Sequence, residues 1–290
     1  MITEIEHLPV TSSRFSSSDL GRIAGITLAV TGVGALGLIL FARVCTDGLE
    51  SRPCPATSYD EAMQRFAQLQ ALDGDDVNPV CQSTLLTHGH QTERSIVLIH
   101  GITNCPQQYM ALAPLFYEQG YNVLIPRMPR NGLADIETDD LKHLTAEELR
   151  EYADTIVDIA RGLGDQVTVV GLSAGGVIAA WVAQFRDDVD KAVVMAPSLS
   201  ILPSVATQRL NVYLKIALFK LFLRLPNIMT QGLKPFREGP AYAYIGHSTR
   251  ALAQVMRLGL AVFRASTVAK PATPSVLVVL NENDAAIDGS

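Results

Sequence analysis

The sequence predicts an α/β protein built on a mostly parallel, doubly wound sheet. Residues 95–100, 167–170 and 275–280 form short runs rich in Val, Ile and Leu, as expected for strands that are buried on both faces. Segments with helical periodicity separate most of the predicted strands. Because strands that alternate with helices pair in parallel through crossovers, we expect helices on both faces of the sheet.

The composition is that of a globular chain with a large apolar fraction. A length of 290 residues allows one α/β domain with an insertion, or two small domains. The hydrophobic fraction of 48% and the mean hydropathy of +0.21 allow a sizeable core. The net charge of -6, without a basic patch interleaved with aromatic residues, excludes nucleic acid as an expected partner.

The N-terminal part predicts a membrane anchor. Residues 1–22 are Ser-rich and polar and are expected to form a disordered tail. Residues 23–42 carry no charge, and as a helix they would span about 30 Å, the thickness of a bilayer core. A cleaved signal peptide is the competing interpretation, but the run is long and no small-residue cleavage site follows it. The arginines on either side of the run leave its orientation open.

A linker and a helix–strand series follow the predicted anchor. Residues 43–57 indicate the linker, and residues 58–290 the folded domain. We predict helices over 58–72, 109–119 and 177–185, strands over 122–126 and 191–196, and an edge strand over 83–87. A further helix opens at Thr145 with a capping box to Glu148 and ends near Gly162 and Gly164.

Four cysteines occur, at positions 45, 54, 81 and 105. Their spacing contains no Cys-x-x-Cys pair and no His/Cys cluster, so no metal is expected. Cys54 and Cys81 flank one predicted helix and could form a disulfide if the domain lies outside the cytoplasm. Free thiols are the alternative.

The stretch Gly171-Leu172-Ser173-Ala174-Gly175 lies between a predicted strand and a predicted helix. A Gly-x-Ser-x-Gly pentapeptide in this context indicates a nucleophile elbow, which exposes the serine hydroxyl above the end of the sheet. Gly171 and Gly175 are expected where strand and helix come too close for a Cβ atom. A Gly-rich turn with an idle serine is the alternative, and the strand–turn–helix context favours the nucleophile.

The strand–helix alternation stops after Pro197 and resumes at residue 275. Helices are predicted over 212–225 and 249–263, so residues 198–270 indicate an insertion that could lie over the elbow. Lys215, Lys220 and Arg224 lie on the first of these helices. They indicate either a lipid-facing surface or a helix packed on the core with its charges reaching to water.

Three features follow one another along the chain. They are a predicted strand that leads into His100-Gly101, the elbow, and a predicted strand followed by Asn281-Glu282-Asn283-Asp284. With this order, residues 95–287 resemble the α/β-hydrolase superfamily, and within it the capped carboxylesterases and monoacylglycerol lipases. The resemblance implies an α/β-hydrolase fold in which the insertion is a helical cap. It implies the following roles: Ser173 is the nucleophile, Asp284 is the acid that orients the base, and the N–H groups of Ile102 and Ala174 form the oxyanion hole.

The catalytic base is the point at which the chain departs from the pattern. The family order places a histidine after the acid, but the six residues after Asp284 contain none. His100 follows a strand and is expected to support the oxyanion loop. We therefore expect the last strand–helix unit, with its histidine, to be missing through truncation, and His143 or His247 are the other candidates for the base.

These features predict a membrane-anchored serine hydrolase that acts on carboxylic esters through an acyl-enzyme. The resemblance implies esters of medium acyl length or monoacylglycerols as substrates, with no metal or organic cofactor. A peptidase or an acyltransferase on the same fold is one alternative. A non-catalytic binding protein that uses the cap pocket is another, and the missing histidine favours it.

Overall fold

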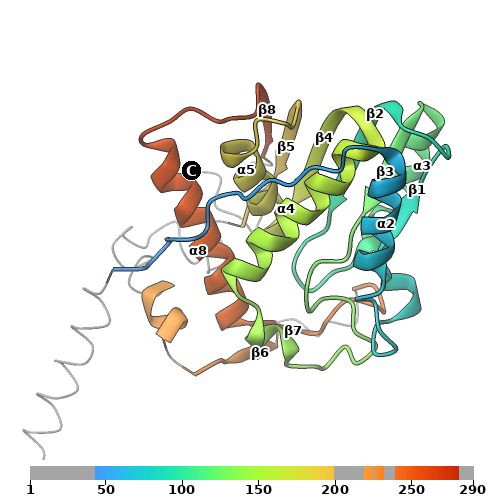
Figure 1. The fold of residues 1–290 in the computed structure, drawn as a ribbon. Coiled ribbons are helices and arrows are strands. Elements are labelled where there is room, and N and C mark those ends of the chain that lie inside the picture. Colours follow the sequence, from blue (N-terminus) through green and yellow to red (C-terminus); the bar gives the residue numbers. More distant parts are fainter. Residues whose placement is uncertain (1–42, 199–218, 225, 232–238, 281–290) are drawn as a thin grey trace, which may run out of the picture. The chain divides into compact units, whose positions relative to one another are not determined.

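The computed structural model describes residues 43–198, 219–224, 226–231 and 239–280 (Figure 1). Those from Val44 onward belong to one compact unit. The predicted tail and the predicted anchor at 23–42 lie outside the described residues, as does Asp284. Within the described part of the chain, no helix is both long and apolar enough to cross a membrane.

The described strands form a six-stranded sheet in the order β1-β3-β2-β4-β5-β8 (Figure 1). All neighbouring strands run parallel except β1, which pairs antiparallel with β3 at one edge. This confirms the predicted parallel sheet and its edge strand. The bounds of the six strands are β1 Thr84–Leu86, β2 Thr92–Ile99, β3 Tyr121–Ile125, β4 Gly164–Leu172, β5 Lys191–Met195 and β8 Ser275–Val279.

Helices cover both faces of the sheet. On one face α4 (Ala146–Leu163) and α5 (Ala174–Phe185) pack directly on the strands, flanked by α2 (Tyr59–Gln70) and α8 (Thr249–Ser266) (Figure 1). On the other face α3 (Ala113–Glu118) packs on β3. Helices on both faces are what a doubly wound sheet requires.

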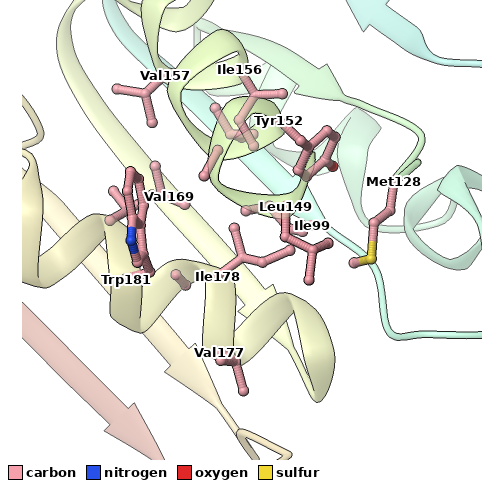
Figure 2. Close-up of a cluster of buried hydrophobic side chains, with 14 of the residues drawn as sticks. Ile99, Met128, Leu149, Tyr152, Ile156, Val157, Val169, Val177, Ile178 and Trp181 are labelled. Carbon is pink, nitrogen blue, oxygen red and sulfur yellow. The ribbon is translucent and has the colours of Figure 1, made fainter. Parts of the chain in front are cut away.

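The core follows the two-residue periodicity of the strands. In β2, Val97 and Ile99 face the α4–α5 layer, whereas Ile96 and Leu98 face the side of α3. Figure 2 shows the larger cluster, in which Trp181 and Ile178 of α5 lie close to β4 and α4. Both faces of the second half of β2 are therefore buried, which explains why residues 96–99 are all apolar.

Two elements differ from the prediction. The expected helix over 109–119 is divided into a 3₁₀ turn, η2 (Pro106–Tyr109), and α3. Pro114 lies in the first turn of α3, where its missing N–H costs nothing, and it favours a new helix start there. In contrast, the capping box of Thr145 and Glu148 is present at the start of α4 as predicted.

The last helix of the predicted insertion belongs to the helical layer. Ala251, Val255 and Leu258 on one side of α8 are buried in the main core, next to α5. Two short strands, β6 (Met229–Gln231) and β7 (Gly246–Ser248), pair antiparallel before it. Residues 219–224 are helical, and Phe219 packs against Val44 and Ala253, which favours the packed interpretation of this helix over the lipid-facing one.

The disulfide differs from the pairing that the sequence suggested. Cys81 is bonded to Cys105, with 5.2 Å between their Cα atoms, and Cys54 is an exposed free thiol. The pairing of Cys54 with Cys81 is therefore wrong. The backbone N–H of Cys54 donates to Asp158 of α4, whereas Cys81 lies in a separate small cluster with Val77 and Cys105.

Candidate active site

Ser173 lies at a sharp turn between the end of β4 and the start of α5, and its side chain is partly exposed. Its backbone has φ 58° and ψ -114°, a conformation that is costly for a residue with a side chain. Two hydrogen bonds hold it there. The N–H of Ser173 donates to the carbonyl of Met195 (3.0 Å), and its carbonyl accepts from the N–H of Ser198 (3.1 Å).

Three glycines make room for this turn. A Cβ atom on Gly171 would lie 1.9 Å from the carbonyl oxygen of Gly175, and one on Gly175 would lie 2.3 Å from that of Ile99. Gly176 has the same constraint, because its Cβ would lie 2.7 Å from the carbonyl oxygen of Met195. Sequence reasoning identified the first two positions and missed Gly176, although the Gly-Gly pair was the signal.

The loop that follows β2, residues 100–105, lies beside Ser173, and we call it the β2 exit loop. A Cβ atom on Gly101 would lie 3.5 Å from the Cβ of Ser173 and 4.0 Å from its Oγ. Ile102 follows in this loop, and Ala174 is the first residue of α5. Among the described residues, no acceptor takes the N–H of either Ile102 or Ala174.

His100 supports the β2 exit loop with both ring nitrogens. Its Nδ1–H donates to the carbonyl of Gly101 (2.8 Å), and its Nε2 accepts from the N–H of Met128 (3.0 Å). The side chain is fully buried. Burial lowers the pKa of His100 to about 4, so the ring is neutral at pH 7. A neutral ring with both nitrogens engaged has no capacity left to act as a base toward Ser173.

The remaining predicted residues have different surroundings. His143 is exposed at the end of a 3₁₀ turn, η3 (Asp140–His143). His247 lies half-buried on β7, and burial lowers its pKa. Within the residues that the structure describes, no three His, Cys, Asp or Glu side chains cluster in a way that could hold a metal ion.

A surface pocket of about 540 Å³ lies between α2 and α4, and Ser173 is not among its lining residues. Its charged side chains are already engaged within the protein: Arg127 pairs with Asp73 (2.6 Å), and Arg130 pairs with Glu148 (2.9 Å). The pocket therefore gives no reason to move the candidate site away from the elbow.

A parallel sheet with helices on both faces and a strained serine between a strand and a helix defines the nucleophile-elbow class of α/β proteins. The chain belongs to the alpha/beta hydrolase family, whose model matches residues 96–289. This result agrees with the resemblance inferred from the sequence.

Two curated relatives match a limited part of the chain. A pyrethroid hydrolase of Sphingobium wenxiniae is 32% identical over 97 residues, which cover 33% of this chain and 33% of the relative. A thermostable monoacylglycerol lipase of a Bacillus species is 26% identical over 100 residues, which cover 32% and 36%. The matched segments thus span about a third of the length of each relative.

Solved structures support the fold alone. A monoacylglycerol lipase of Paleococcus ferrophilus matches with a TM-score of 0.51 and 20% identity, covering 71% of this chain and 79% of that one. A structure from work on two metagenome-derived lipolytic enzymes matches with a TM-score of 0.50 and 18% identity, covering 71% and 89%.

Proposed function

We propose that this protein is a serine hydrolase that acts on carboxylic esters, with Ser173 as the nucleophile. The observation that carries the proposal is the strained, partly exposed serine at a Gly-lined turn directly beside Gly101. The two curated relatives support the same chemistry within the matched segments, since one is a pyrethroid hydrolase and the other a monoacylglycerol lipase. Esters of medium acyl length or monoacylglycerols remain the proposed substrates.

The proposed reaction has two steps. The Oγ of Ser173 attacks the ester carbonyl, its proton passes through a base to the leaving alcohol, and an acyl-enzyme forms. Water then attacks the acyl-enzyme and releases the acid. The negative oxygen of each tetrahedral intermediate would accept the N–H groups of Ile102 and Ala174, which have no other acceptor among the described residues. The positive end of the α5 dipole adds to this stabilisation.

We propose that Asp284, which lies outside the described residues, is the acid that orients the base. His143 and His247 are the proposed candidates for the base within the described part of the chain. His143→Ala and His247→Ala, compared with Ser173→Ala in an ester assay, identify the histidine in use.

A fluorophosphonate probe tests the nucleophile. We expect covalent labelling that disappears in Ser173→Ala and persists in Ser266→Ala, which changes an exposed serine at the end of α8. A panel of esters on the same variants gives the substrate class. Labelling that survives in Ser173→Ala would exclude Ser173. Probe binding without any covalent product would favour the binding-protein alternative.

We also propose that residues 23–42 anchor the protein in a membrane, with the folded domain on the side where disulfides form. The uncharged run of bilayer length supports the anchor. The buried Cys81–Cys105 bond supports the oxidising side, because disulfides rarely persist in the cytosol.

The anchor and its orientation have separate tests. The full chain should resist carbonate extraction, whereas a chain beginning after Arg43 should be released. Equal release of both would contradict the anchor. Alkylation of whole cells before lysis should leave Cys81 and Cys105 unmodified and bonded, and modification of both would place the domain on the reducing side.

A further inference from the structure

Two hydrogen bonds at Thr103 hold the β2 exit loop from outside the loop. The N–H of Thr103 donates to Oδ1 of Asn131 (2.9 Å), and its carbonyl accepts from the N–H of Tyr244 (2.9 Å). Thr103 has φ 67°, which a β-branched residue adopts only when its surroundings impose it. The shape of the loop at Ile102 thus depends on contacts that lie outside the loop.

The contact from Asn131 is itself supported by a closed ring. Asn131 is fully buried, and the next residue, Gly132, accepts the N–H of Asn78 at its carbonyl (2.9 Å). Asn78 caps the 3₁₀ turn η1 (Pro79–Cys81). Cys81 is bonded to Cys105, two residues after Thr103. The ring therefore runs from Thr103 through Asn131, Gly132, η1 and the disulfide, and back to the β2 exit loop.

Gly132 is the point at which the ring is most tightly packed. A Cβ atom there would lie 2.7 Å from the Cβ of Cys81 and 3.3 Å from the Cβ of Cys105, and its φ is 73°. The turn that carries Asn131 hence rests directly on the disulfide. Any separation of the two sulfur atoms would remove the surface against which this turn is placed.

We propose that the Cys81–Cys105 disulfide and Asn131 are positioning residues for the chemical step, an inference that rests on the proposed function. Together they keep Thr103 in its left-handed conformation, and through it they aim the N–H of Ile102 at the oxygen of the reacting carbonyl. Without the disulfide, the turn that carries Asn131 and Gly132 loses one of its supports and Thr103 relaxes to a negative φ. The segment from Gly101 to Thr103, which includes the N–H of Ile102, then shifts with it.

The nucleophile itself is held independently of this ring. Ser173 is fixed by hydrogen bonds to Met195, the last residue of β5, and to Ser198, which follows β5, and not by the β2 exit loop. Loss of the ring therefore affects the oxyanion donor and leaves the serine in place. The acylation rate should depend on the oxidation state of this one cysteine pair, and probe affinity should not.

The test uses the full chain and a fluorophosphonate probe. Three variants are compared with the unchanged chain: Cys81→Ala with Cys105→Ala, Asn131→Ala, and the matched control Cys45→Ser with Cys54→Ser, which removes only the two exposed thiols. The first-order rate of labelling at Ser173, kinact, and the probe affinity, KI, are measured separately. Hydrogen exchange at residues 102–104 is followed in parallel.

Loss of one oxyanion donor costs about 10²–10³ in rate, so a displaced donor should lower kinact by about ten-fold or more. KI should stay within about two-fold, because ground-state binding does not use the donor. The two ring variants combined should cost no more than the larger single effect, since both break the same ring. Exchange at 102–104 should accelerate in both, and the control should match the unchanged chain in every measurement.

Two results would overturn the proposal. The first is a folded disulfide-free variant in which hydrogen exchange at 102–104 is faster but kinact is unchanged. That result would show that the ring supports the loop without affecting the chemical step. Another is unchanged exchange, which would show that the ring does not hold the loop. If the cysteine variant fails to fold, Asn131→Ala decides by the same two criteria. If the unchanged chain is never labelled at Ser173, the proposed function fails, whereas exchange at 102–104 still tests the ring alone.

Discussion

At the scale of single residues, His100 couples the candidate site to pH. Its Nε2 accepts the N–H of Met128, and protonation would replace that acceptor with a donor. The neutral ring is therefore part of the folded structure, and burial lowers its pKa to about 4 from an ordinary 6.5. Since the folded pKa is below the unfolded one, the stabilisation is complete above about pH 6.5 and is lost as pH falls toward 4.

We predict that the free energy of unfolding falls by about 2 kcal/mol between pH 7.5 and 5 because of His100, from the 1.36 kcal/mol that each pKa unit represents. Denaturant titrations at several pH values measure this. His100→Asn should be less stable at pH 7.5 and should have a flatter pH profile. His247→Gln removes the contribution of the other histidine with a lowered pKa. Equal slopes for His100→Asn and the unchanged chain would refute the prediction.

At the scale of elements, a buried ionic network ties the segment before α2 to α4 and α5. Arg186 is fully buried and contacts Asp154 (3.1 Å), Asp158 (2.7 Å) and Asp188 (2.7 Å). Asp154 also accepts from Ser51 and Arg52, and Asp158 accepts the N–H of Cys54. Removing the cation leaves carboxylates buried without a counter-ion, which is more costly than the loss of an exposed pair.

We predict that Arg186→Met destabilises the domain by about 3–5 kcal/mol at pH 7.5, the range for breaking one side of a buried pair. The deficit should shrink as pH falls, because the stranded carboxylates can then become neutral; burial already raises the pKa of Asp158. Lys142→Met, which removes the exposed partner of Asp139, is the control and should cost under about 1 kcal/mol. A similar loss in both variants would contradict the account.

At the scale of elements, the features that the sequence predicts are those whose residues are contiguous in the chain. Helix α4 was predictable because its capping box, its apolar stripe and its terminal glycines all lie within one continuous segment. The elbow was predictable for the same reason, since Ser173 and its glycines are contiguous. The disulfide joins residues 24 positions apart, and the contact between Asn131 and Thr103 joins residues 28 apart. Neither leaves a local pattern, because each depends on how the loops pack.

At the scale of the whole molecule, the described part of the sheet ends in β8, an edge strand with exposed apolar side chains. Among the described strands, β8 pairs with β5 alone. Val276, Leu277, Val278 and Val279 are exposed by 40 to 54%. A long apolar edge strand invites pairing with another chain, and native proteins usually cover it or place charges on it. In contrast, the opposite edge strand, β1, is partly buried along its length.

We predict that the 290-residue chain self-associates through β8 and that Val278→Lys shifts the equilibrium toward the monomer. The control Val268→Lys, which changes an exposed side chain outside the sheet, should have no effect. Sedimentation of the unchanged chain and of both variants over a range of protein concentrations measures the association. A 290-residue chain that is monomeric at high concentration would contradict the edge argument.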